Sequence, residues 1–231
     1  MKEKIILVLD VSSREEAMKL VRPLYEHVGM FKVGMQLFTA EGPSVVREIV
    51  DLGGKVFLDL KFHDIPNTVA HGVLEAAKLG VSLMTIHAAG GRAMMETVAK
   101  ELQDKLGDRK PMVVAVTVLT SLNDAGLQEI GIARPMAPQV AAMAKLAEDC
   151  GLAGVVCSPQ EIRLVRGAAG PNFKIVTPGI RMPGQSANDQ QRLATPREAL
   201  NAGADYIVVG RAVTAAADPR LALDTLLQSI Q

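Results

Sequence analysis

The sequence predicts a single α/β domain that folds as a (β/α)8 TIM barrel over residues 1–231. Three observations lead to this fold class. The chain has 231 residues, a length at which an α/β barrel commonly forms one domain. Hydrophobic residues make up 48% of the chain and aromatic residues only 3%, so aliphatic side chains must fill the core, as in a parallel sheet covered by helices. Finally, short apolar runs alternate with stretches of helical spacing along the chain.

The predicted strands are short apolar runs, rich in β-branched residues and bounded by Gly, Asp or Pro. They span residues 5–10, 31–35, 55–61, 83–88, 112–119, 154–158, 174–180 and 206–211. Between them, helical spacing of apolar residues and capping glycines predict helices. The predicted helices span residues 12–28, 39–53, 68–80, 90–107, 137–151, 159–170 and 195–203. This alternation favours a closed barrel over the alternative, an open doubly wound sheet.

One long stretch without predicted structure, residues 181–192, follows the seventh strand. Loops of this length are uncommon in compact domains and often act as lids. Active sites of barrels lie at the C-terminal ends of the strands. We therefore expect residues 182–192 to form a lid over such a site.

Charge and composition exclude several partners. The 25 basic residues balance the 25 acidic ones, so no net field would attract nucleic acid or an anionic membrane. No stretch approaches the roughly 20 apolar residues that cross a bilayer, and the apolar run at residues 5–9 is too short for a secretory signal. We expect a cytoplasmic protein. Because no HExxH, CxxC pair or carboxylate trio with metal-ligand spacing is present, we expect neither a metal nor a cofactor.

The densest group of polar residues at a strand end is DLKFHDIPNT, residues 59–68. Asp59 and Lys61 are two positions apart and are expected to face the same side of the third strand. Lys32, on the second strand, can join them. Alternating charges would hold each group in place, which suits a catalytic site, although a structural ion-pair network is the alternative.

A second group follows the seventh and eighth strands, at Arg181 and at the Gly210–Arg211 pair. Loops at these positions of a barrel commonly bind phosphate. Gly210 allows a ligand to approach the backbone, and Arg211 supplies a bidentate charge. A phosphate site is therefore predicted here.

Together with DLKFHDIPNT, the most specific segment, the chain contains ILVLD, FKVG, TIHAAGG, VTVLTS, TPGIR, DQQR, TP and GADYIVVGR. In this order and spacing, the segments resemble the bacterial orotidine 5'-monophosphate decarboxylase family along nearly the whole chain. The resemblance implies a cofactor-free enzyme that converts orotidine 5'-monophosphate (OMP) to uridine 5'-monophosphate (UMP). That reaction is the last step of de novo pyrimidine nucleotide biosynthesis.

The resemblance also implies the catalytic residues. Lys61 would protonate the ring carbon that loses its carboxylate, within a charged tetrad that also contains Lys32, Asp59 and Asp64. In such enzymes the equivalents of Asp64 and Thr68 act in the site of the partner subunit of a homodimer. This suits a segment that lies beyond the end of its strand and can reach a neighbour.

The remaining residues would bind the substrate. Asp10 and Lys32 would hold the ribose hydroxyls, and Thr120 and Ser121 would lie against the pyrimidine edge. The phosphate would be bound by Arg181, Gln190, Gly210 and Arg211.

Two other functions are compatible with a barrel of this kind. A magnesium-dependent sugar-phosphate decarboxylase or aldolase of the same superfamily shares the Asp-x-Lys-x-x-Asp pattern, but it has a Glu ligand where this chain has Lys32, whose ammonium would repel a cation. A non-catalytic barrel that only binds a phosphate ligand would not need Lys61 or Asp64.

Overall fold

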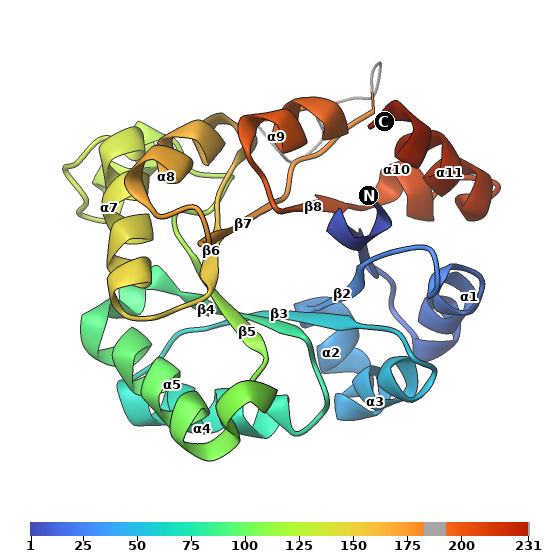
Figure 1. The fold of residues 1–231 in the computed structure, drawn as a ribbon, viewed down its shortest axis with the longest axis horizontal. Coiled ribbons are helices and arrows are strands. Elements are labelled where there is room, and N and C mark those ends of the chain that lie inside the picture. Colours follow the sequence, from blue (N-terminus) through green and yellow to red (C-terminus); the bar gives the residue numbers. More distant parts are fainter. Residues whose placement is uncertain (183–192, 231) are drawn as a thin grey trace.

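In the computed structural model, which describes residues 1–182 and 193–230, eight parallel strands close into a barrel in the order of the sequence (Figure 1). The strands are β1 (Ile5–Val8), β2 (Met30–Gly34), β3 (Val56–Phe62), β4 (Leu83–His87), β5 (Met112–Val116), β6 (Gly154–Val156), β7 (Lys174–Thr177) and β8 (Tyr206–Val209). Each predicted strand overlaps one of them. The predicted (β/α)8 fold class is therefore confirmed.

Helices surround the barrel (Figure 1). They are α1 (Arg14–Leu24), α2 (Met35–Glu41), α3 (Pro43–Asp51), α4 (Pro66–Ala77), α5 (Gly91–Leu106), α6 (Asp124–Glu129), α7 (Met136–Asp149), α8 (Ile162–Ala168), α9 (Pro196–Ala202), α10 (Arg211–Thr214) and α11 (Pro219–Ser229). Proline occupies the first turn of α3, α4, α9 and α11. Its lack of an N–H costs nothing there, because N–H groups of the first turn have no acceptor within the helix. Among the described residues, no helix combines the length and the hydropathy that a membrane span requires.

The helical regions differ from the prediction in two ways. The predicted helix 39–53 is divided at Gly42, whose φ of 63° ends α2 before Pro43 begins α3. Glycine adopts this left-handed conformation at little steric cost. In addition, α6, α10 and α11 had not been predicted. The first two have only 6 and 4 residues, which is too short to show an apolar period.

Two apolar layers make up the core. The larger one lies between the barrel and the helices. The smaller one fills the inside of the barrel and consists of Ile6, Val8, Met30, Phe57, Leu83, Val114, Val176 and Val208. Because successive side chains of a strand point to opposite faces, these inward-facing positions determine which residues reach the barrel mouth.

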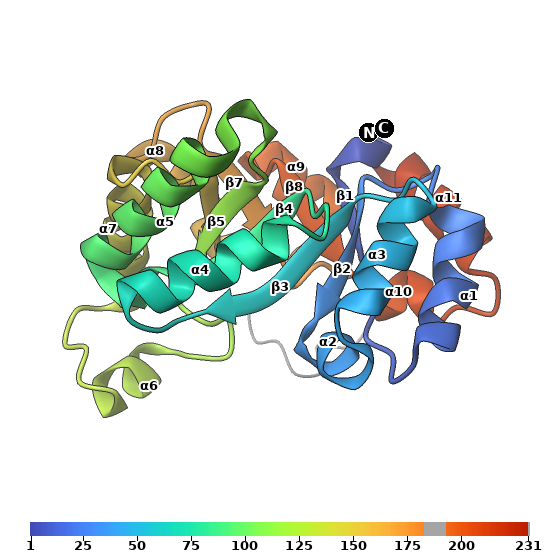
Figure 2. The same cartoon turned by 90° about the horizontal axis from the view of Figure 1, so that it is seen from below.

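A polar layer lies directly above the apolar floor of the barrel. Two positions beyond the floor residues of β2, β3 and β4 are Lys32, Asp59 and Thr85, so these side chains share the inward direction. Asp59 and Thr85 are buried. Figure 2 shows α6 projecting on the side where the strands end, opposite the N-terminus. The fold thus places polar groups at the mouth of an otherwise apolar barrel.

Candidate active site

A cavity of about 300 Å³ opens at the C-terminal mouth of the barrel. Its floor is apolar and its rim is charged. The lining residues are Val8, Asp10, Lys32, Phe57, Asp59, Lys61, Thr120, Val156, Val176, Pro178, Gly179, Arg181, Val208, Gly210 and Arg211. Eight of the residues predicted from the sequence therefore line one cavity, although they come from strands far apart in the chain.

A carboxylate between two ammonium groups forms the centre of the site. The Lys61 Nζ donates to both oxygens of Asp59, at 2.8 Å and 2.9 Å. The Lys32 Nζ lies 3.2 Å from Asp59 Oδ2. The three side chains are 10–29% exposed. Partial burial strengthens these charge interactions relative to water.

The two lysines determine the charge of Asp59. Burial alone would raise the pKa of its carboxyl, but the charges and hydrogen bonds of Lys32 and Lys61 outweigh burial and hold this pKa below its ordinary value of 3.8. The carboxylate is therefore ionised throughout the neutral range, and it can hold both ammonium groups in place.

Lys61 has an unusual backbone conformation. Its φ is 52°, and it is the one non-glycine residue with a positive φ in residues 1–182 and 193–230. The β3–β4 register shifts at this point, since Leu58 pairs with Met84 but Phe62 pairs with Ile86. Such conformations cost about 1–3 kcal/mol and occur where the surrounding structure enforces them, often in functional sites. The predicted Asp59–Lys61 contact thus forms where the β3–β4 pairing is irregular, and not along a regular strand.

The part of the cavity formed by the segments after β7 and β8 carries two arginines. The Arg181 backbone N–H donates to Ala194 O at 3.0 Å, and its Nη1 donates to Ile180 O at 2.9 Å. Arg211 begins α10 directly after Gly210. A Cβ added at Gly210 would lie 3.7 Å from the nearest atom of Val8. The protein therefore leaves space beside this backbone, which a ligand can approach. This part of the cavity can present positive charge to an anion.

Comparisons with known proteins agree with this geometry. The sequence model of the Orotidine 5'-phosphate decarboxylase / HUMPS family matches residues 3–226. The chain belongs to this family. The orotidine 5'-phosphate decarboxylase of Syntrophomonas wolfei is 53% identical over 222 residues, which are 94% of this chain and 93% of that protein. The enzyme of Geotalea daltonii is 51% identical over 98% of this chain and 95% of its own length.

A solved structure supports the same relationship. The crystal structure of the orotidine 5'-phosphate decarboxylase from Lactobacillus acidophilus superposes with a TM-score of 0.87 at 39% sequence identity, and the match covers 98% of each chain. The OMP decarboxylase / HUMPS family therefore accounts for the whole described barrel, and not only for its active-site motifs.

Four predicted site residues of this OMP decarboxylase / HUMPS family member do not line the described cavity. Asp64 and Thr68 are exposed, and Asp64 Oδ1 accepts a hydrogen bond from the Ile65 backbone N–H. Ser121 is also exposed, next to the cavity residue Thr120. Gln190 and the predicted lid from residue 183 onward lie outside the described residues.

Two residues beside the cluster of Lys32, Asp59 and Lys61 had not been predicted. Thr85 Oγ1 accepts from the Lys61 backbone N–H at 2.9 Å and donates to Asp59 Oδ1 at 3.0 Å. Gly34 makes room for Lys32, because a Cβ there would lie 3.0 Å from Lys32 Nζ. A polar residue at an inward position of an apolar strand is the signal that could have identified Thr85.

Two histidines stack beside the cluster. The rings of His63 and His87 have centroids 5.1 Å apart and an interplanar angle of 18°. Burial, followed by the charges of His63 and Lys61, lowers the pKa of His87. His87 Nδ1 accepts a hydrogen bond from the Ala89 backbone N–H at 3.2 Å. His87 is thus expected to be neutral near pH 7 and to add no further positive charge at the mouth.

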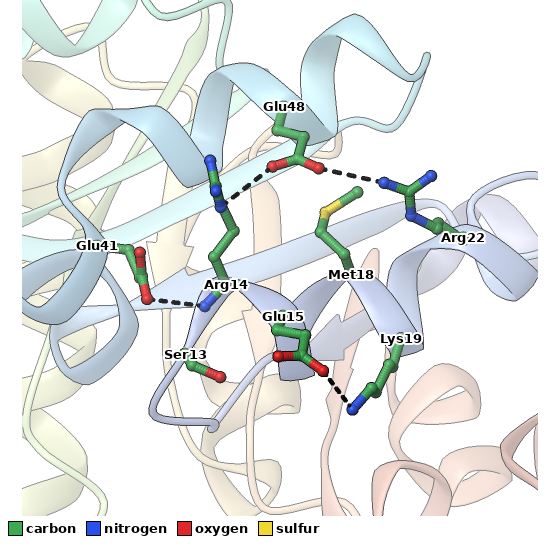
Figure 3. Close-up of a pocket in the computed structure, with 8 residues that line it drawn as sticks. All are labelled: Ser13, Arg14, Glu15, Met18, Lys19, Arg22, Glu41 and Glu48. Carbon is green, nitrogen blue, oxygen red and sulfur yellow. Dashed lines mark hydrogen bonds and ion pairs between the residues drawn. The ribbon is translucent and has the colours of Figure 1, made fainter.

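A larger open groove of about 760 Å³ lies outside the barrel, on α1 and the neighbouring α2 and α3 (Figure 3). Ion pairs link five of its charged residues. Glu48 contacts Arg14 and Arg22 at 3.6 Å and 3.4 Å, and Glu15 contacts Lys19 at 2.8 Å. The groove contains none of the residues at the strand ends, so we place the reaction in the smaller cavity.

The described part of the chain contains no cluster of three or more His, Cys, Asp or Glu side chains that could hold a metal ion. Nor do the two lysines of the cavity favour a cation, because each ammonium would repel it. The metal-free reaction expected from the sequence stays a prediction that chelation can test.

Proposed function

We propose that the cavity at the barrel mouth decarboxylates OMP to UMP without a cofactor, with Lys61 as the proton donor. The observation that carries this proposal is the Asp59 carboxylate held between Lys32 and Lys61, in the same cavity as two arginines. One end of the cavity suits a reaction that develops negative charge. The other end suits a phosphate.

The chemistry needs a strong electrostatic contribution. When the bond between the ring carbon and its carboxylate breaks, carbon dioxide leaves and the electron pair remains on a carbon with no adjacent electron sink. The required barrier reduction therefore approaches the upper end for enzymes, about 23 kcal/mol. A cation fixed where this charge develops is the largest stabilising contribution available. The Lys61 ammonium fills that role, gives its proton to the carbon, and regains one from solvent.

Substrate binding supplies the remainder. Arg181, Gly210 and Arg211 are proposed to bind the phosphate, together with Gln190 from the segment outside the described residues. Asp10 and Lys32 are proposed to hold the ribose, and Thr120 and Ser121 the pyrimidine edge. Binding energy from the distant phosphate can offset the cost of orienting the ring against Lys61.

We also propose that the enzyme is a cytoplasmic homodimer of one-domain subunits, in which Asp64 and Thr68 complete the site of the partner. Both side chains are exposed and lie outside the cavity of their own chain. A second copy that covered the segments after the strands would also bury exposed apolar side chains. They are Met35, Ile65, Leu119 and Ile130, with 40–68% exposure.

The test uses the absorbance change that accompanies conversion of OMP to UMP. The purified chain is expected to consume OMP, and exhaustive chelation is expected to leave the rate unchanged. Loss of activity that magnesium restores would favour the magnesium-dependent alternative. Binding of UMP without turnover of OMP would favour a non-catalytic phosphate-binding barrel.

A further inference from the structure

We propose that Thr85 is a positioning residue for the reaction: its hydroxyl couples the main chain of Lys61 to the carboxylate of Asp59 and thereby sets the position of the Lys61 ammonium. This inference rests on the proposed role of Lys61 as proton donor. It assigns a function to a strand residue that does not line the cavity.

The location of Thr85 excludes a role in direct contact with the substrate. It lies on β4, within the polar layer above the barrel floor, and its exposure is 0%. The cavity is lined by neighbouring residues of β2 and β3, but not by Thr85. A buried hydroxyl at this position therefore acts through the residues to which it is bonded.

The hydrogen bonds of Thr85 have a defined direction. The Lys61 backbone N–H donates to Thr85 Oγ1 at 2.9 Å, so the hydroxyl is the acceptor in this bond. The single hydroxyl proton then points to Asp59 Oδ1, 3.0 Å away. A hydroxyl can accept one bond and donate another at the same time. Valine has the same shape but can do neither.

Each bond meets a structural need of the site. Lys61 has a φ of 52°, a conformation that side-chain-bearing residues rarely adopt and that must be held by its surroundings. The bond to Thr85 satisfies the Lys61 N–H at the point where the β3–β4 pairing is irregular. The bond to Asp59 fixes one carboxylate oxygen, and Lys32 contacts the other at 3.2 Å.

The consequence concerns chemistry more than binding. Without the hydroxyl, the Lys61 backbone and the Asp59 carboxylate lose their common partner, and the ammonium is less well placed against the reacting carbon. The proposed phosphate contacts come from the segments after β7 and β8 and remain intact. The turnover number should therefore fall much more than the Michaelis constant changes.

The experiment compares Thr85→Val and Thr85→Ser with the wild-type enzyme. For Thr85→Val we expect a kcat for OMP that is lower by about tenfold to a hundredfold, with a KM within about threefold of wild type. Thr85→Ser keeps the hydroxyl and should return kcat to within about fivefold of wild type. UMP binding, measured by calorimetry, should be similar in all three proteins.

Thr117→Val is the matched control. Thr117 follows β5 and is also fully buried. It donates its hydroxyl to Val156 O at 2.9 Å and bonds to neither Lys61 nor Asp59. Its loss should leave kcat within about threefold of wild type. If Thr85→Val is insoluble, Thr85→Cys provides the same comparison with Thr85→Ser, because a thiol is a weak donor and acceptor.

The proposal is overturned if Thr85→Val keeps the wild-type kcat, if its KM alone rises, or if Thr85→Ser is as impaired as Thr85→Val. An equal loss in Thr117→Val would also overturn it, since any buried hydroxyl would then have the same effect. Wild type and Lys61→Ala are assayed in parallel. If wild type and Lys61→Ala both fail to decarboxylate OMP, the proposed function is wrong. If wild type is active and Lys61→Ala is not, an unchanged kcat in Thr85→Val counts only against the role of Thr85.

Discussion

At the scale of single residues, the space beside Gly34 controls the position of Lys32. A Cβ at Gly34 would lie 3.0 Å from Lys32 Nζ, so the ammonium would have to shift by a few tenths of an ångström. The backbone of Gly34 is extended, with φ of −95°, so alanine can adopt it. Gly34→Ala is therefore expected to fold and to lower kcat by about threefold to tenfold, as a displaced charge loses part of its effect.

A control for this substitution is Gly167→Ala. Gly167 lies in α8, and no heavy atom beyond its own helix backbone and chain neighbours lies within 4 Å of an added Cβ. Replacement should raise the free energy of unfolding by up to about 1 kcal/mol through helix propensity, without changing kcat. Steady-state assays and thermal melts measure both effects. An unchanged kcat in Gly34→Ala would contradict the role given to this space.

The pH dependence of stability reports on Asp59. Its pKa lies below 3.8 in the folded protein, whereas in the unfolded chain it returns to about 3.9. Because folding lowers the pKa of Asp59, this carboxylate stabilises the folded protein at any pH above its pKa in the unfolded chain. The stabilisation is lost as the pH falls through its pKa in the folded protein. Asp59→Asn is expected to lower the free energy of unfolding by roughly 2 kcal/mol at pH 7. Removing one partner of a fully buried ion pair would cost more, but here the lysines keep contact with water.

Denaturant titrations of wild type and Asp59→Asn from pH 7 to pH 3 test this expectation. The difference between their free energies of unfolding should be constant at higher pH and should shrink below about pH 4. A difference that grows on acidification would show that the Asp59 pKa is raised by folding.

Residue-level prediction succeeded where a pattern was local. Asp59, Lys61 and Lys32 could be grouped because neighbouring parallel strands end at the same face. Thr85 was missed, because its signal was a single polar residue at an inward position of an apolar strand, and this signal is weaker than a motif. The left-handed backbone of Lys61 depends on the β3–β4 register, and no sequence pattern reveals that register.

At the scale of elements, the strands were predictable because each buries an apolar run between turn residues. Helices with few buried residues were not. α2 buries only Leu37, so it shows no apolar stripe, and the sequence pattern merged its second half with α3. α11 buries Leu223 and Leu226 and begins after the capping residue Asp218. The sequence thus contained a capping residue and an apolar stripe for α11, but the stripe has only two buried residues.

The loops after β7 and β8 carry the next prediction. If Arg181 and Arg211 bind the phosphate, orotidine without its phosphate should show a lower kcat as well as a higher KM. A loss of about a hundredfold or more in kcat/KM is expected, since two charge-assisted contacts of roughly 1.5–3 kcal/mol each disappear. Steady-state kinetics with the nucleoside measure both constants. An increase in KM alone would make the phosphate a passive anchor.

At the scale of the whole molecule, the proposed dimer predicts complementation between two inactive variants. Lys61→Ala and Asp64→Ala homodimers should each have very low activity, because every site lacks one member of the tetrad. After mixing and subunit exchange, half of the dimers are hybrids, and each hybrid has one intact site if Asp64 acts in the partner. Activity should then return to about a quarter of wild type.

The control is a mixture of Lys61→Ala with Lys32→Ala, two residues of the same chain's cavity. Every site of these hybrids keeps a lesion, so activity should not return. If the Lys61→Ala and Asp64→Ala mixture also remained inactive after demonstrated exchange, Asp64 would serve the site of its own chain.

Turnover of OMP by Lys61→Ala, measured beside UMP binding on the same preparation, tests most directly whether the cluster at the barrel mouth performs the reaction. The variant should bind UMP with an affinity close to wild type, because the proposed phosphate contacts come from the segments after β7 and β8. Its kcat should fall by about 10⁴-fold or more, because the substitution removes the proposed proton donor, which is also the proposed stabilising cation. Substitution of Lys19, an exposed lysine of α1, should change neither quantity. If Lys61→Ala bound UMP and still decarboxylated OMP at a rate near wild type, the assignment of Lys61 as proton donor would be contradicted.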